Sequence, residues 1–276
     1  LAVDGILFGE STRTRISGGH AITVNVRDLA SLDKHRRIFL GNCELTLAGA
    51  GTRLTVNSHV PARQSRGLWL TAEDGAKFVN PSSDFGDNCD FYHVARGHGS
   101  EVRIGLGARP AVADNCGFEA HSGGLVALTG RHSLGLGGIN HAYVAEGGTL
   151  NLPAVGIKGG TSLIRIVGSG TVTLGTANVD GGTVTLKPDS SWNGSAAHLT
   201  VAGDLSLGAN VRYAVDFAGF PDLAKTDRIA FARAGGTVSL VAPKAGIDVI
   251  GGDGRRIELE ADGDFVYLKL TNASEQ

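Results

Sequence analysis

The fold of this chain is decided by a segment that reads Tyr92-His-Val-Ala-Arg-Gly-His-Gly-Ser-Glu-Val-Arg-Ile104 and is followed by Phe118-Glu-Ala-His-Ser-Gly-Gly-Leu-Val-Ala-Leu128. In both stretches, two alternating or apolar runs flank a short polar turn that contains glycine. The pattern recurs along the chain, and five of its glycines are each separated by 24 residues: Gly51, Gly75, Gly99, Gly123 and Gly147. A fixed period of this length is typical of a repeat architecture.

Each repeat holds two short strands joined by a glycine turn and has no helical stretch. This arrangement indicates the coils of a parallel β-helix. The composition agrees, because the 276 residues include 42 glycines, only 7 prolines and no methionine, and β-branched residues are abundant. We therefore predict an all-β fold: a right-handed, single-stranded parallel β-helix (a solenoid) with a modified C-terminal β cap.

The regularity of the pattern divides the chain into three parts. The glycine repeat is central, the N-terminal part is less regular, and from about Asn210 the spacing between strand-like runs becomes irregular. A solenoid needs structures that cover the edges of its first and last coils. We therefore expect an N-terminal cap with the first coil, then the β-helix coils, then the last coils with a β-rich cap, in residues 1–40, 41–209 and 210–276.

Details of the spacing give local predictions. Gly170 follows Gly147 by 23 residues, and Gly182 follows Gly170 by only 12, which fits half a coil. In the final part, two Asp-Gly pairs are typical of hairpin turns; these are Asp253-Gly254 and Asp262-Gly263. Two longer segments interrupt the repeat and are expected to project side by side from one face as loops, over residues 80–88 and 106–115.

Charge and hydropathy argue against two classes of partner. The 25 basic and 27 acidic residues give a net charge of −2, so no overall basic field attracts nucleic acid or an anionic membrane surface. No run approaches the ~20 apolar residues that a membrane-spanning helix needs. The sequence begins at Leu1 without a charged and apolar leader, which we interpret as a processed or excised fragment whose export signal would already be gone.

Three cysteines, Cys43, Cys89 and Cys116, are each preceded by asparagine. Their separations of 46 and 27 residues are close to two coils and one coil, which predicts similar positions in their coils. One interpretation is a ladder of small, buried and inert side chains. The alternative is a disulfide between Cys89 and Cys116, because neighbouring coils stand ~4.8 Å apart. Zinc is not expected, since neither C-x-x-C nor a paired histidine spacing is present.

A family resemblance lies in residues 199–240. The segment reads Leu199-Thr-Val-Ala-Gly-Asp-Leu-Ser-Leu-Gly-Ala-Asn-Val-Arg-Tyr-Ala-Val-Asp216 and continues with Thr226-Asp-Arg-Ile229 and Gly235-Gly-Thr-Val-Ser-Leu240. It resembles the C-terminal coils of bacterial autotransporter passenger domains, which are secreted right-handed β-helices, many of them adhesins. The resemblance implies an extracellular or cell-surface location and an adhesive role.

A second resemblance concerns Gly97-His98-Gly99 with Arg103-Ile104. These residues resemble fragments of the signature of polygalacturonases, glycoside hydrolases with a pectin-lyase-like β-helix. The paired aspartates of that family are missing ahead of the glycines, and Gly105 stands where the family has lysine. Because Gly99 is also one of the five repeat glycines, we assign His98 to the turn and not to a hydrolytic site.

A broader candidate site is the surface formed by the two long loops and the neighbouring strands. Polysaccharide lyases with a β-helix use acidic residues to bind calcium and a basic residue to abstract a proton beside a uronate. By that resemblance, His93 or Arg96 would act as the base. The alternative is that the Asp-Asn pairs before cysteine only turn the loops, by bonding their own backbone. The catalytic candidates are Asp87, Asp114, His93 and Arg96, with Glu119 and His121 nearby, and the calcium candidates are Asp84, Asp87 and Asp90.

These observations lead to an expected function. We expect an exported structural or adhesive protein that contacts carbohydrate or a surface protein, or that self-associates. The alternative is a polysaccharide lyase or glycoside hydrolase that acts on a uronate-rich glycan. No cofactor is expected, and calcium is the only candidate ion. Trp69 is expected within a coil, whereas Trp192 lies in a polar segment where it could stack on a sugar or cap the fold.

Overall fold

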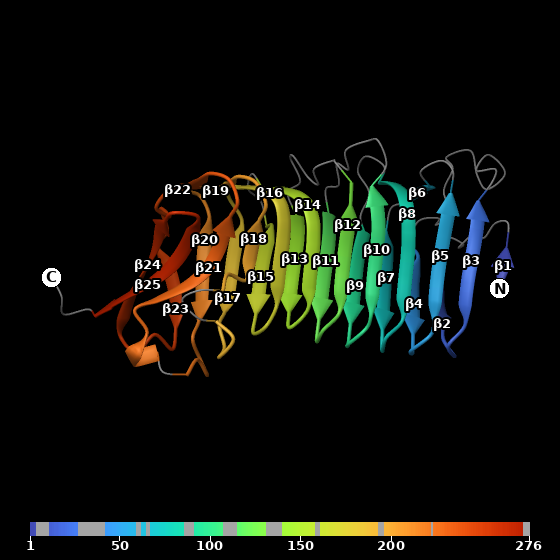
Figure 1. The fold of residues 1–276 in the computed structure, drawn as a ribbon, viewed down its shortest axis with the longest axis horizontal. Helices are drawn as coiled ribbons and strands as arrows, with labels where there is room; N and C mark the ends of the chain where they lie inside the picture. Colours follow the sequence, from blue (N-terminus) through green and yellow to red (C-terminus); the bar gives the residue numbers. More distant parts are fainter. Residues whose placement is uncertain are drawn as a thin grey trace.

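A computed structural model describes residues 1–3, 11–26, 42–58, 62–64, 67–85, 91–106, 115–130, 140–157, 161–192, 196–221 and 223–272. In these residues the chain forms β-strands throughout, with one 3-10 turn, η2 (Leu223–Lys225), and no α-helix. The strands stack side by side along one long axis, with the N-terminus at one end and the C-terminus at the other (Figure 1). The fold is a parallel β-solenoid, as the glycine repeat predicts.

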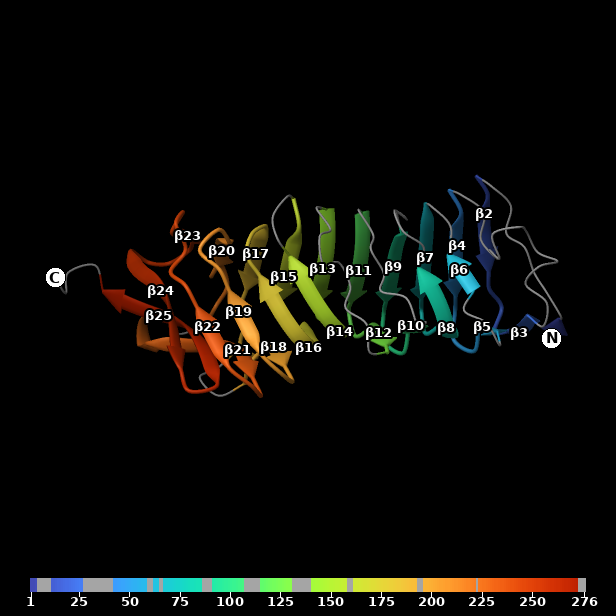
Figure 2. The ribbon, with the colours of Figure 1, turned by 90° about the horizontal axis from the view of Figure 1, so that it is seen from above.

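Successive strands of a coil alternate between two sheets, which form two layers when the molecule is seen from above (Figure 2). The first sheet contains β1 (Ala2–Val3), β3 (Ala21–Val26), β5 (Arg53–Ser58), β6 (Ala62–Gln64), β8 (Lys77–Phe85), β10 (Glu101–Leu106), β12 (Leu125–Thr129), β14 (Thr149–Ile157), β16 (Thr171–Val179), β18 (Leu199–Val201), β19 (Leu205–Leu207), β21 (Arg228–Ala234), β22 (Val238–Leu240), β24 (Arg255–Asp262) and β25 (Phe265–Asn272).

The second sheet is parallel along its whole length. It contains β2 (Arg13–Ile16), β4 (Glu44–Ala48), β7 (Leu68–Glu73), β9 (Phe91–Arg96), β11 (Asn115–His121), β13 (Asn140–Glu146), β15 (Leu163–Val167), β17 (Thr183–Lys187), β20 (Arg212–Asp216) and β23 (Ile247–Ile250).

The register of the first sheet confirms the 24-residue period. Lys77, Glu101, Leu125 and Thr149 are aligned on four neighbouring strands, and each is 24 residues from the next. The five repeat glycines have φ angles between +66° and +84°, a backbone conformation that glycine adopts without steric cost. The shorter step from Gly170 to Gly182 is half a coil, because β16 belongs to the first sheet and β17 to the second.

Buried hydroxyl groups link the turns of neighbouring coils. Ser100 Oγ donates to its own coil at Arg96 O, 2.6 Å away, and accepts from the backbone N–H of Gly75, 2.9 Å away on the preceding coil. Thr52 Oγ1 does the same with Ala48 O at 2.7 Å and Gly19 N at 3.1 Å. These side chains supply partners for backbone groups in the turns, where the strand ladders stop.

Inward-facing side chains form columns along the axis, since neighbouring coils repeat in register and side chains alternate across a strand. One column holds His93, Phe118 and Tyr143, whose rings stack with centroid separations of 5.7 and 6.2 Å. Leucine, valine and isoleucine fill the remaining columns and form one continuous hydrophobic core. Each coil therefore buries its apolar residues mainly against the next coil.

The C-terminal end departs from the parallel arrangement, as expected for a β cap. β25 pairs antiparallel with both β21 and β24. Asp262-Gly263 joins β24 to β25 in a hairpin, which confirms that prediction. The hairpin prediction for Asp253-Gly254 is wrong: both residues have positive φ and make a turn, but it connects β23 of the second sheet to β24 of the first.

The first of the two expected loops is partly strand. Residues 80–85 extend β8, because Ser83, Asp84 and Phe85 pair with β6. Residue 115 likewise begins β11. The remaining parts of both loops, residues 86–88 and 107–114, lie outside the described residues, and the prediction that they project side by side stays a prediction.

Candidate functional site

The outward face of the second sheet carries aromatic and charged side chains in two columns. In one column, Trp69 of β7, Tyr92 of β9 and Gly117 of β11 are aligned on consecutive strands. In the other, nearer the turn, Arg96 aligns with Glu73 on one side and with His121 on the other. The parallel register therefore assembles this face from residues that are about one coil apart in sequence.

The two rings of the aromatic column, those of Trp69 and Tyr92, are stacked on each other and are called the platform below. The rings of Trp69 and Tyr92 are parallel within 4°, and their centroids lie 5.9 Å apart. The side chain of Trp69 is 40% exposed, whereas that of Trp192, the other tryptophan of the chain, is 3% exposed. The ring of Tyr92 occupies the space above Gly117, where a Cβ atom would lie 2.6 Å from its Cε1. Glycine at this position therefore lets the phenol ring lie over the neighbouring strand.

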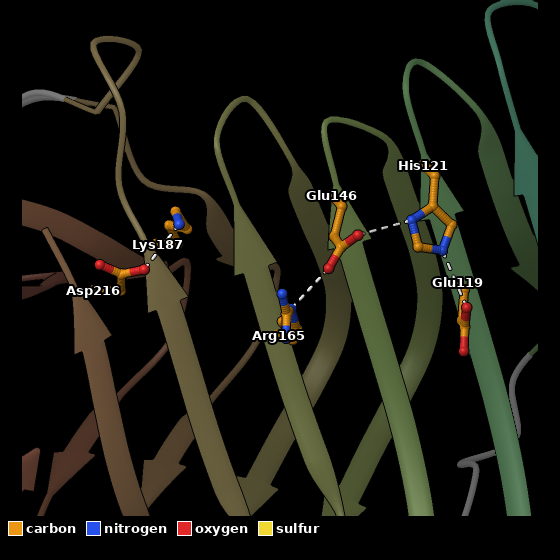
Figure 3. A network of polar contacts seen from close by, with 6 residues as sticks. All are labelled: Glu119, His121, Glu146, Arg165, Lys187 and Asp216. Atoms are coloured by element: carbon orange, nitrogen blue, oxygen red, sulfur yellow. Dashed lines mark hydrogen bonds and ion pairs between the residues drawn. The ribbon is translucent and has the colours of Figure 1, made fainter. Parts of the chain in front are cut away.

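A polar network continues this face toward the C-terminus (Figure 3). His121 lies between two carboxylates, with Nε2 3.1 Å from Glu119 Oε2 and Nδ1 3.1 Å from Glu146 Oε2. Glu146 also accepts from Arg165, whose Nε is 2.7 Å from Oε1. Each contact of His121 is a hydrogen bond when the ring nitrogen concerned carries a hydrogen atom.

A separate ion pair begins on β17, two coils beyond Glu146 on the same face (Figure 3). Lys187 Nζ is 2.8 Å from Asp216 Oδ2. The hydrogen bond from Lys187, followed by one from the backbone N–H of Ala218, lowers the pKa of Asp216. Both this pair and the His121 cluster are partly exposed, so each contributes modestly to stability. Their main effect is to neutralise charge along the column.

Arg96 differs from its neighbours in this column. Its side chain is exposed, and among the described residues it makes no ion pair. The carboxylate of Glu73 is 2.8 Å from Arg15 Nη1, and that of Glu119 is bonded to His121. Asp74, in the turn after Glu73, also makes no ion pair with Arg96. The guanidinium group of Arg96 is therefore available to an external anion.

Three hollows lie toward the C-terminal end, and one of them, about 500 Å³, is an open hollow beside Phe220 and the buried Trp192. A shallow one of about 220 Å³ lies on the outward face of the second sheet, over β15, β17, β20 and β23. A larger one of about 600 Å³ lies between β23 and β24, and is lined mostly by apolar residues with Arg255, Arg256 and Glu258. None of the three hollows is lined by a residue that the sequence singled out for catalysis. The platform and Arg96 are therefore the better candidate site.

The sequence-predicted site residues are only partly brought together. Arg96, Glu119 and His121 do lie on one outward face, as the sequence suggests. His93 does not: it is fully buried in the interior column, where desolvation lowers its pKa from 6.5 to about 3. Its assignment as a surface base is wrong, because the alternation of β9 turns Tyr92 and Val94 outward and His93 inward.

The remaining acidic candidates are not placed. Asp84 belongs to β8 in the first sheet, and its side chain is not described. Asp87, Asp90 and Asp114 lie outside the described residues, so both the catalytic and the calcium assignments stay predictions. Within the described ranges, no group of three or more His, Cys, Asp or Glu side chains is arranged to hold a metal ion.

The cysteines are structural where they are described. Cys43 and Cys116 are buried free thiols, and Cys89 lies outside the described residues. The disulfide considered between Cys89 and Cys116 is therefore absent. Cys43 and Cys116 share one register position of the second sheet, and two strands, with Leu68 and Phe91 at that position, lie between them. Burial raises the pKa of the Cys116 thiol, which disfavours the reactive thiolate.

Of the two roles that the sequence allows for Trp192, stacking on a sugar or capping the fold, the first is wrong. Trp192 is buried, donates from Nε1 to Gly168 O at 2.6 Å, and stacks on His198 with 4.2 Å between centroids. It is therefore not available to stack on a sugar. Trp69 lies in a coil as expected, yet faces outward. The sequence contains a signal for this outward position. Leu68 and Leu70 on either side are apolar, so alternation places them in the core and Trp69 on the opposite face.

None of the helical residues described in the structure belongs to a segment long and apolar enough to cross a membrane. Comparisons with protein-family models, with curated protein sequences and with solved structures found no match to this chain.

Proposed function

We propose that this chain is an exported structural and adhesive solenoid, located at the cell surface or outside the cell, that binds carbohydrate on the outward face of its second sheet. The observation that carries the proposal is the parallel pair of Trp69, which is 40% exposed, and Tyr92, which is half-buried, on the outward face of a parallel sheet. The resemblance of residues 199–240 to autotransporter passenger domains supports the same role and location.

The physical argument is that aromatic side chains combine a large apolar surface with a polar tip, which suits them to recognition. A pair held parallel by a sheet is already ordered, so binding loses little conformational entropy. Thr71 and Thr46 lie on the adjacent outward column, where their hydroxyl groups can bond to sugar hydroxyls. A rigid platform with nearby hydroxyl groups therefore fits a sugar ring better than it fits an extended apolar partner.

The proposal is tested by glycan-array binding of the wild-type chain, a Trp69→Ala variant and an Ile250→Ala variant. Ile250 is the matched control, because it is 65% exposed on the last strand of the same sheet. We expect Trp69→Ala to lose at least tenfold in affinity for every bound glycan and Ile250→Ala to bind as the wild type does. Binding that is absent from the wild type, or unaffected by Trp69→Ala, would overturn the proposal.

The same glycans separate adhesion from catalysis. Each bound glycan is incubated with the wild-type chain and examined for new reducing ends and for unsaturated uronides. Adhesion leaves the glycan intact. Turnover that is lost in Asp87→Ala and Asp114→Ala would replace the adhesive function with that of a polysaccharide lyase or glycoside hydrolase.

A further inference from the structure

We propose that Arg96 is the anion-binding residue of this face, so that the ligand is an anionic oligosaccharide, with one ring on the Trp69–Tyr92 platform and a carboxylate or sulfate group on Arg96. This inference rests on the proposed function and specifies its ligand class. It begins from the charge balance of the face, in which the carboxylates of Glu44 and Glu73 are already paired with Arg13 and Arg15.

Among the described residues, no carboxylate pairs with Arg96, which therefore places a positive charge beside the platform. On its other side, the carboxylates of Glu119 and Glu146 are bonded to His121, and Glu146 is also bonded to Arg165. A free guanidinium group in such surroundings presents a planar set of donors that matches carboxylate or sulfate oxygens. A neutral sugar cannot form an ion pair with Arg96, whereas an anionic sugar gains a charge-assisted hydrogen bond to it.

The geometry sets the size of the ligand. Tyr92 and Arg96 lie on the same strand and the same face, four residues apart, which corresponds to about 13 Å along β9. Val94 lies between them on the same face and is only 8% exposed, so its side chain does not project between Tyr92 and Arg96. A ligand that covers the platform and reaches Arg96 therefore extends along the strand and contains more than one sugar ring.

The test uses hexasaccharides offered in charged and neutral forms. Hyaluronan and alginate supply carboxylates and are compared with their methyl esters, and keratan sulfate supplies sulfate without uronate and is compared with its desulfated form. The variants are Arg96→Gln and, as the matched control, Arg212→Gln. Arg212 is also exposed on an outward position of the second sheet and makes no ion pair in the described residues, but lies on β20, far from the platform.

We expect the wild type to bind at least one charged hexasaccharide tenfold or more tightly than its neutral form. Arg96→Gln should reduce that ratio to about one, while Arg212→Gln leaves it unchanged. The charged form that shows the preference identifies carboxylate or sulfate as the recognised group. Equal loss in both arginine variants would mean non-specific attraction to a positive surface, and would overturn the assignment of Arg96.

The failure of this inference is distinguishable from failure of the proposed function. If charged and neutral hexasaccharides bind equally, and Trp69→Ala abolishes both, the platform binds carbohydrate and Arg96 has no role in it. If the glycan array shows binding but no hexasaccharide binds to the wild type, the role of Arg96 is wrong and the carbohydrate function stands. If the array also shows no binding, both are wrong.

Discussion

The indole ring of Trp69 and the phenol ring of Tyr92 lie parallel on neighbouring strands, with 4° between their planes and 5.9 Å between their centroids. The arrangement extends to a third coil, because the ring of Tyr92 lies over Gly117. Three consecutive coils therefore contribute to one surface, through Trp69, Tyr92 and Gly117. Gly117, which has no side chain, is as necessary to this surface as the two rings are.

Gly117→Ala should disturb the platform without unfolding the solenoid. The new Cβ atom would displace the ring of Tyr92, which is a flexible side chain at the surface, so the free energy of unfolding should fall by no more than ~1 kcal/mol. We expect weaker glycan binding and a changed near-ultraviolet circular dichroism signal from Trp69. These are measured beside urea denaturation of the same variant.

Gly148→Ala is the contrasting control for this prediction. A Cβ atom on Gly148 would lie 2.6 Å from the backbone oxygen of Ala120, and backbone cannot swing aside. This variant should lose ~3 kcal/mol of unfolding free energy. Equal losses in the two glycine variants, or an unchanged aromatic signal in Gly117→Ala, would contradict the described position of the Tyr92 ring.

Ser100→Ala should loosen two neighbouring turns. The hydroxyl group bonds Arg96 O and the N–H of Gly75, and both groups would lose this partner in a buried setting. We expect a loss of about 1–3 kcal/mol in unfolding free energy, with faster amide exchange at Gly75. Ser100→Thr is the control, since Thr52 makes the same pair of bonds in another turn. A threonine variant as unstable as the alanine variant would argue against the role of the hydroxyl group.

The parts of the fold that the sequence predicts are those that depend on local conformation. A positive φ angle favours glycine at a position, so Gly75, Gly99 and the other repeat glycines are visible as a period. The platform depends instead on contacts between coils. That the Tyr92 ring lies over Gly117 follows from the register of β9 and β11, which the spacing of glycines in other turns does not specify.

The errors have a common physical origin. The resemblance to polysaccharide lyases suggests a surface role for His93, and the polar segment around Trp192 suggests one for that residue. In the fold, His93 stacks on Phe118 and Trp192 stacks on His198, each a contact between residues at least six positions apart. Composition reports how polar a segment is on average, whereas burial in a solenoid is decided residue by residue through alternation.

The burial of His93 makes a prediction about acid stability. Its pKa is about 3 in the folded chain and near 6.5 when unfolded, so protonation favours the unfolded chain. The contribution of neutral His93 to the free energy of unfolding is constant above pH 6.5 and is lost as the pH falls from 6.5 toward 3. At pH 4 the loss from this residue is on the order of 3 kcal/mol.

His93→Phe provides the measurement. Phenylalanine continues the ring column at Phe118 and does not titrate. Urea denaturation at pH 7, 5.5 and 4 should show a smaller decrease in unfolding free energy for the variant than for the wild type. Any packing difference between the two side chains is the same at each pH, so it does not affect this slope. Identical slopes for the two proteins would mean that His93 is not buried in its neutral form.

Arg255 should be essential to the C-terminal cap. Its guanidinium group donates to Leu223 O at 2.8 Å, Thr226 O at 2.6 Å and Leu270 O at 2.9 Å. It thereby joins the β24–β25 hairpin to η2 and the segment after it. Lysine carries the same charge but cannot present this planar set of donors. Arg255→Lys should therefore cost about 3 kcal/mol of unfolding free energy, because partly buried carbonyl groups lose their partners.

Arg256→Lys is the matched control at the adjacent position. Arg256 is mostly exposed and pairs with Glu258 at 2.8 Å, a surface contact that lysine can replace, so the change should stay within ~0.5 kcal/mol. Hydrogen exchange should locate the effect of Arg255→Lys in β24, β25 and η2 and leave the central coils protected. If the two lysine variants are equally stable, or exchange increases along the whole solenoid, Arg255 does not hold the cap in this way.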